Sequence, residues 1–199
     1  MISLGLGSLV SDNVKYGEKV SVGEYSIVGG ADITQILHIG SSTHIGSFCK
    51  ICSGCIIGSY CEIDDYCAIY SNVSIGDRVK VLYGKKVYSG AVIGHDCIIG
   101  GNIPERMILD DRVTFMGEVA HSHYNPKNDW DTTDEPSPHI GTGSIIGTNA
   151  LLIGGITIGS NCYVSAGEIL RHDLPENSVF YKNKIYMLSD FRGLIQTRF

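Results

Sequence analysis

The chain has 199 residues, of which 43% are hydrophobic and 18% are charged, and this length suits one substantial domain. Its formal net charge of −6 argues against nucleic acid or an anionic membrane as the main partner, because both need a basic surface. The first ten residues lack the positive charge of a secretory signal, and no apolar run is long enough to span a membrane. We therefore expect a cytoplasmic protein.

Residues 1–26 precede the clear repeat. Val14 and Val20 keep a weak version of its spacing, followed by a slip of one residue. Because the open end of a repeat array exposes apolar groups and unpaired strand edges, we predict that residues 1–26 form an N-terminal cap.

From residue 27 onward an apolar residue returns at every sixth position. Six residues advance roughly 600° on a helix, so these positions would not form one stripe there. Short strands joined by bends fit the spacing, with the branched residue pointing inward and a following glycine allowing the tight turn. Three such hexads make one triangular coil, and stacked coils bury a continuous core. The predicted anchors are Ile27, Ile33, Ile39, Ile45, Ile51, Ile57, Ile63, Ile69, Ile75, Val81, Val87, Ile93 and Ile99.

The cysteines provide an independent check on this all-β solenoid. Six of the seven lie four residues after an anchor, which predicts a column of small inward-facing side chains in place of a metal cluster or a ladder of disulfides. Only Cys52 lies outside the column. The members of the column are Cys49, Cys55, Cys61, Cys67, Cys97 and Cys162.

Two segments interrupt the repeat. The run from Gly101 to Arg112 breaks the phase and predicts a small excursion, with Val113 and Val119 as a surviving fragment of the repeat. From Glu118 to His139 a polar segment that holds the only Trp replaces the hexads, and it predicts a protruding functional loop. The register then returns at six anchors, which are Ile140, Ile146, Leu152, Ile158, Val164 and Leu170.

The hexads and the closing segment from Ile156 to Ser178 resemble the hexapeptide-repeat acyltransferases. The family's terminal signature is matched by residues 156–159, 165–168, 171–173 and 175–178. The resemblance implies a left-handed parallel β-helix over residues 27–178. Residues 179–199 hold alternating apolar residues, which predict a C-terminal extension with a short helix near Leu188 to Leu194. It also implies acyl transfer to a saccharide or nucleotide-sugar, acetyl-CoA or another acyl-CoA as co-substrate, no metal, and a homotrimer.

The resemblance also implies a histidine general base in the loop. Met116 and His121 match the family's M-x-x-x-x-H spacing, and His123 is the second candidate. Imidazole suits proton transfer at neutral pH, although both residues also fit ordinary surface histidines. A base of this kind needs a carboxylate or carbonyl on its second ring nitrogen, and Glu118 and Asp96 are candidates. No serine or cysteine nucleophile motif is visible, so we expect direct transfer, with Cys52 as the residue to test otherwise.

Carried over from the family, Thr148, Ala166, Arg171 and His172 are the expected contacts of coenzyme A. Two alternatives remain open at this point. A γ-type carbonic anhydrase shares this fold and would hold zinc with histidines such as His95, His121 and His123. A non-catalytic scaffold is the third possibility, because a fold alone does not imply an activity.

Overall fold

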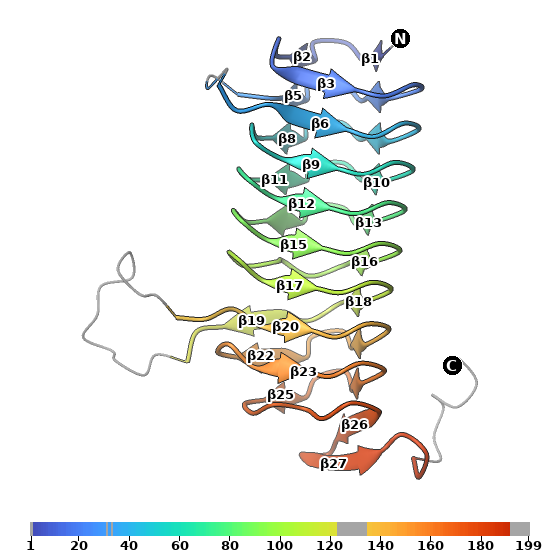
Figure 1. Ribbon diagram of the computed structural model, residues 1–199, viewed down its shortest axis with the longest axis vertical. Helices are drawn as coiled ribbons and strands as arrows, with labels where there is room; N and C mark the ends of the chain where they lie inside the picture. The colour runs from blue at the N-terminus through green and yellow to red at the C-terminus, as the bar shows by residue number, and fades with distance from the viewer. Residues whose placement is uncertain (1, 31, 33, 123–134, 192–199) are drawn as a thin grey trace.

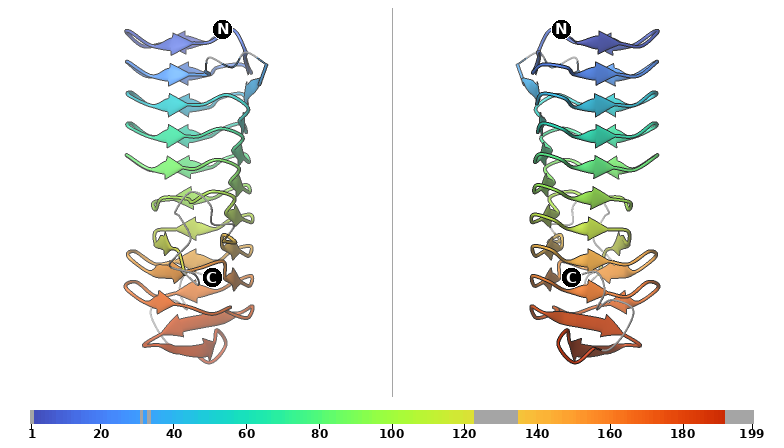
Figure 2. Two further views of the ribbon diagram at one scale, coloured as in Figure 1. Left: turned by 90° about the vertical axis from the view of Figure 1, so that its left-hand side faces the viewer. Right: turned by 90° about the vertical axis from the view of Figure 1, so that its right-hand side faces the viewer.

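The computed structural model describes residues 2–30, 32, 34–122 and 135–191. Within these residues all regular secondary structure is short β-strand, and the strands stack as coils along one long axis from β1 to β27 (Figure 1). The side views show each face of the stack as a column of parallel strands (Figure 2). The prediction of a parallel β-helix is confirmed.

The strands form four sheets, which we call sheets A to D. Sheet A contains β1 Ser3–Leu4, β4 Ser21–Val22, β7 His44–Ile45, β10 Glu62–Ile63, β13 Lys80–Val81, β16 Ile98–Ile99, β18 Thr114–Phe115, β21 Ile145–Ile146, β24 Tyr163–Val164, β26 Ser178–Tyr181 and β27 Lys184–Met187. Sheet B contains β2 Leu9–Val10, β5 Ile27–Val28, β8 Lys50–Ile51, β11 Ala68–Ile69 and β14 Lys86–Val87. Sheet C contains β3 Val14–Tyr16, β6 Leu37–Ile39, β9 Ile56–Ile57, β12 Ser74–Ile75, β15 Val92–Ile93, β17 Ile108–Leu109, β20 His139–Ile140 and β23 Thr157–Ile158. Sheet D contains β19 Glu118–Ala120, β22 Leu151–Ile153 and β25 Ile169–Leu170.

Each regular coil visits sheets A, B and C once and takes 18 residues, as the pairing of Ile63 with Val81 shows. Sheet D replaces sheet B in the last coils. The turns therefore lie along three edges of a triangular prism. We call them the AB edge (turns from sheet A into sheet B or D), the BC edge (turns from sheet B or D into sheet C) and the CA edge.

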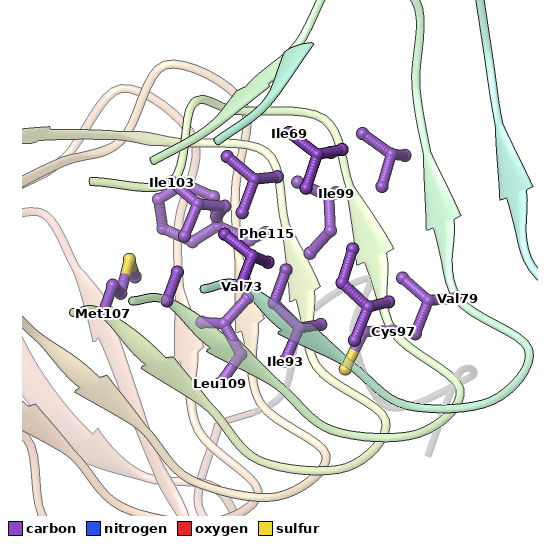
Figure 3. Close-up of a cluster of buried hydrophobic side chains, with 14 of the residues drawn as sticks. Ile69, Val73, Val79, Ile93, Cys97, Ile99, Ile103, Met107, Leu109 and Phe115 are labelled. Atoms are coloured by element: carbon purple, nitrogen blue, oxygen red, sulfur yellow. The ribbon is translucent and has the colours of Figure 1, made fainter. Parts of the chain in front are cut away.

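The predicted anchors form the core. From Ile39 to Ile99 and again from Ile140 to Leu170, every predicted anchor is at most 3% exposed, because alternate residues of each strand point inward. The cysteine column is also confirmed: its six members are at most 2% exposed, and all seven cysteines are free. Figure 3 shows this packing, with Cys97 near Ile93 and with Ile103 near Phe115.

The predicted phase is wrong at its start. Val28, and not Ile27, is the buried residue of β5, and Ile27 is 49% exposed. Val28 pairs with Ile51 across 23 residues, so this coil is five residues longer than a regular coil, and the extra residues lie in the turn after β5. Ile33 lies outside the described residues. The predicted cap at residues 1–26 is built from solenoid strands, since β1 to β4 pair in parallel with the following coil.

The predicted excursion at residues 101–112 is also wrong. Ile99 pairs with Phe115 across 16 residues, so this coil is two residues short and no segment protrudes from it. Ile103 and Met107 are fully buried, and Ile103 makes a single bridge to Val87 in place of a strand. The anchors here are Leu109 and Phe115, and Val113 occupies the column of small side chains.

The C-terminal extension folds as a β-hairpin. Strands β26 and β27 pair antiparallel across the turn at Lys182 and Asn183. The carboxylate of Glu168 accepts hydrogen bonds from both turn amides, at 2.6 Å and 3.1 Å. The predicted helix near Leu188 is not present through residue 191, where the chain forms a turn, and the rest of that prediction lies outside the described residues.

Candidate active site

His121 lies on the BC edge, directly after β19. The strand holds it in place, because Val119 pairs with Leu152 and the amide of Gly154 donates to the carbonyl of Ala120 at 2.8 Å. The His121 side chain is 46% exposed. The loop is shorter than the predicted range of residues 118–139, because β19 and β20 at its two ends still belong to the solenoid. The departure from the coil begins at His121 itself.

A carboxylate from the other end of the loop holds the imidazole. Nδ1 of His121 lies 2.9 Å from Oε2 of Glu135, whose side chain is only 10% exposed. The other carboxylate oxygen, Oε1, accepts hydrogen bonds from the amide of Ser122, at 2.5 Å, and from the Ser122 hydroxyl. Glu135 therefore joins the two ends of the loop and fixes the orientation of the ring.

The electrostatic surroundings keep Glu135 ionised. Burial alone would raise the pKa of its carboxyl, but the hydrogen bonds from Ser122 and His121 outweigh this effect and the pKa lies below its usual value. An ionised carboxylate accepts a hydrogen bond from an Nδ1 that carries a proton. This arrangement selects the tautomer whose Nε2 carries the lone pair, which is the form that a general base requires.

A small recess lies beside the imidazole. Its walls include Pro104 from the coil above, Val119 from β19, Pro138 from the end of the loop and Gly154 from the coil below. The Ser137 hydroxyl donates to the carbonyl of Glu105 and ties the returning chain to the shortened coil. The recess therefore combines apolar walls with one oriented histidine.

The sequence did not reveal Glu135 as the partner of His121. Glu118 lies on β19 with an exposed side chain, and Asp96 lies on the CA edge, where Arg78 binds both of its oxygens at 2.6 Å and 2.9 Å. In the structure the carboxylate that contacts Nδ1 of His121 is that of Glu135. His123 lies outside the described residues.

The four expected coenzyme A contacts lie on two different edges. Thr148 and Ala166 are exposed on the AB edge in successive coils, where the amide of Gly167 donates to the carbonyl of Thr148 at 3.0 Å. Arg171 and His172 are exposed on the BC edge, below Gly154 and on the same edge as His121. A single chain therefore places two of these residues on the edge of the histidine and two across sheet D.

Two cysteines of the column, Cys55 and Cys97, are poorly suited to nucleophilic catalysis. Burial raises the pKa of Cys55 and of Cys97 to about 11, so both thiols stay protonated at neutral pH. Their Sγ atoms donate to the carbonyls of Tyr70, at 2.9 Å, and of Asp110, at 3.1 Å. Cys52 is half-buried on the BC edge, away from the column.

The described residues contain no cluster of three or more metal-ligating side chains. His95, one of the histidines considered for zinc, lies on the CA edge, at the other side of sheet C from His121. Its Nδ1 accepts a hydrogen bond from the amide of Asp77 at 2.9 Å. No helix among these residues is long and apolar enough to cross a membrane.

Comparisons with known proteins support the fold. No family model matches the chain. The bifunctional protein GlmU of Rhizobium rhizogenes is 24% identical over 104 residues, and that of Carboxydothermus hydrogenoformans is 30% identical over 108 residues. These matches cover 49% and 48% of the chain but only 23% of each relative.

Two solved structures superpose over most of the chain. The UDP-N-acetylglucosamine acyltransferase of Francisella novicida gives a TM-score of 0.72 at 18% identity and covers 90% of this chain and 66% of its own. The enzyme of the same name from Campylobacter jejuni gives 0.65 at 15% identity, with 99% and 78% covered. The chain therefore has the left-handed parallel β-helix fold of the hexapeptide-repeat proteins.

Proposed function

We propose that the chain is an acyltransferase that moves an acyl group, acetyl being the first to test, from acyl-CoA to a hydroxyl or amino group of a saccharide or nucleotide-sugar. The observation that carries the proposal is the pair of His121 and Glu135 beside an apolar recess. The acyltransferases with the same fold, and the GlmU proteins with partial sequence similarity, support the choice of reaction.

In this mechanism His121 removes the proton of the attacking group. Glu135 holds Nδ1, so the proton moves to Nε2 while the acceptor oxygen or nitrogen bonds to the thioester carbonyl. The resulting imidazolium is stabilised by the ionised Glu135. When the carbon–sulfur bond breaks, His121 returns the proton to the leaving sulfur, so the products are the acylated acceptor and a free thiol.

Transfer is direct in this proposal. The buried thiols of Cys55 and Cys97 are protonated and donate to backbone carbonyls, so they do not supply a thiolate for a covalent intermediate. Seven free cysteines also fit a reducing compartment such as the cytoplasm, where acyl-CoA is made.

The chain is expected to act as a homotrimer. Thr148 and Ala166 lie on the AB edge and His121 lies on the BC edge, so these groups meet only if the edges of two copies are adjacent. A closed ring of three copies brings each AB edge to the BC edge of a neighbour. Arg171 and His172 would then face the same boundary and offer a cation to the phosphates of the donor.

The test is thiol release from acetyl-CoA with a panel of sugars, amino sugars and nucleotide-sugars. We expect acceptor-dependent release with the native chain and a large loss with His121→Ala. His38→Ala is the matched control, because His38 is also exposed but lies on β6, far along the prism from the loop. Undiminished release with His121→Ala removes His121 from the mechanism, and no release with any acceptor favours the scaffold alternative.

A further inference from the structure

A second recess lies on the outer face of sheet C, where its strands turn into the CA edge. Figure 1 shows β15, β17 and β20 one below another on this face. The recess has a volume of about 340 Å³, which is in the lower range of pockets that bind small ligands. We call it the sheet C recess, and its lining includes Val92, Gly94, Ile108, Asp110, Asp111 and Thr142.

Part of this lining is apolar. Val92 and Ile108 are paired across β15 and β17, and their outward side chains are 43% and 39% exposed. A ligand that covers these two side chains removes apolar surface from water, which favours binding.

Asp110 interrupts a column of glycines. Each of the other seven strands of sheet C is followed directly by glycine. Glycine suits this position because a Cβ at Gly76, for example, would lie 2.7 Å from the carbonyl carbon of Gly94 in the next coil. The chain therefore places a carboxylate where its other coils present only backbone. The glycines are Gly17, Gly40, Gly58, Gly76, Gly94, Gly141 and Gly159.

The two carboxylates of the recess are held in place by one oxygen each. Oδ1 of Asp110 lies 3.0 Å from Nε2 of His139, and Oδ1 of Asp111 accepts a hydrogen bond from the amide of His95 at 2.8 Å. Oδ2 of each aspartate can accept from a ligand, because an ionised carboxylate offers about four acceptor sites. Two carboxylates side by side suit a ligand with neighbouring hydroxyl groups.

We propose that the sheet C recess binds a sugar ring of the acceptor, whose neighbouring hydroxyl groups donate to Asp110 and Asp111 while its C–H face covers Val92 and Ile108. This site deepens the proposed function and rests on it for the choice of a sugar. The ring is either a second ring of a saccharide or the ribose of a nucleotide-sugar, because both carry neighbouring hydroxyl groups.

The position of β20 indicates how long the acceptor is. Pro138 directly precedes β20 and lines the recess beside His121, whereas Thr142 follows β20 and lines the sheet C recess. Four residues of extended chain span roughly 13 Å. A single sugar ring is too short to occupy both recesses, so the acceptor contains at least two linked rings, with the acylated one beside His121.

The test measures the binding of N,N′-diacetylchitobiose and of UDP-N-acetylglucosamine by isothermal titration calorimetry, without acyl-CoA. It compares the native chain with Asp110→Gly, which restores the residue found after the other strands of sheet C and should keep the native circular dichroism. Asp64→Gly is the matched control, because Asp64 also follows a buried strand residue, Ile63, but is exposed on the AB edge. We expect Asp110→Gly to weaken binding at least tenfold, because hydrogen bonds to a charged acceptor are lost, and Asp64→Gly to leave it unchanged.

Weaker binding of N,N′-diacetylchitobiose assigns the recess to a second saccharide ring, and weaker binding of UDP-N-acetylglucosamine alone assigns it to a ribose. In the thiol-release assay the Michaelis constant for the acceptor should rise in Asp110→Gly while kcat stays near the native value, because His121 is untouched. Native affinity of Asp110→Gly for both probes, or no binding of either probe at millimolar concentration, would overturn the site.

The site and the proposed function fail separately. Acceptor-dependent thiol release together with native affinity in Asp110→Gly removes the sheet C recess and leaves the transferase. Weakened binding in Asp110→Gly, with no thiol release from the native chain, leaves the recess as a sugar site and removes the transferase.

Discussion

Replacing Glu135 by glutamine should disable the proposed base without unfolding the protein. The carboxamide is nearly isosteric, but it can place a donor where Oε2 now accepts from Nδ1 of His121. The ring would then take the other tautomer, with the proton on Nε2, and could not accept a proton from the acceptor. General-base catalysis contributes about 10²- to 10⁴-fold, so we expect kcat to fall by that factor, or roughly 3–5 kcal/mol in the barrier.

The assay is acceptor-dependent thiol release across pH, with the Michaelis constant for acetyl-CoA as a second readout that should stay near the native value. The pH dependence of stability gives an independent check. Because the pKa of Glu135 is lower in the folded chain than in the unfolded chain, its ionised form stabilises the fold. This stabilisation is complete above the unfolded pKa, near 4.3, and is lost as the pH falls through the folded pKa.

Glu118→Gln separates Glu135 from one of the two carboxylates that the sequence offered. It changes an exposed side chain on β19 by the same single atom, so we expect little change in kcat. If Glu135→Gln kept the native rate while Glu118→Gln lost it, the assignment of the orienting carboxylate would be wrong. Native rates in both variants would refute the reasoning on the histidine.

Two further predictions concern stability. Phe115 is one of the largest fully buried side chains, so Phe115→Ala should lower the free energy of unfolding in urea by about 3–5 kcal/mol. Phe48 is exposed, so Phe48→Ala should change the free energy of unfolding by less than about 1 kcal/mol. Glu168→Ala removes the acceptor of the Lys182 and Asn183 amides and should speed hydrogen exchange at these two sites, while the core strands stay protected. Equal exchange at Asn183 in both proteins would show that the carboxylate does not hold the hairpin.

The sequence predicted the solenoid because its signal is local and repeated. An inward β-branched residue every six positions needs no information about distant contacts, and the buried column from Ile39 to Ile99 follows the pattern. The errors at Ile27 and at residues 101–112 have one cause. Five extra residues after Val28, and two missing before Ile103, change the phase inside turns whose composition gives no sign of it.

The site was harder to predict because its geometry depends on a long-range closure. The spacing of Met116 and His121 pointed to the histidine, but Glu135 reaches it from 14 residues further along the chain. The loop sequence does not determine which acid contacts the ring, and Glu118 and Asp96 were the two candidates. The acid residue was therefore available in the sequence, while the contact was not.

The shortened coils explain why a recess exists beside His121 at all. The step from Ile99 to Ile103, like that from Phe115 to Val119, takes four residues, whereas a regular step from one sheet to the next takes six, so the chain reaches the next face two residues early. Sheet B ends at β14, sheet D begins at β19, and Pro104 and Val119 line the recess at this break. A solenoid tolerates such a change because each coil contacts only its neighbours.

Inserting two residues after Gly100 should therefore restore a regular coil and fill the recess. We expect at least a tenfold loss of kcat/KM with cooperative unfolding retained. The same insertion after Gly84 lengthens a regular coil on the same edge and serves as the control, with activity kept. Native activity after the insertion at Gly100 would show that the short coil does not shape the site.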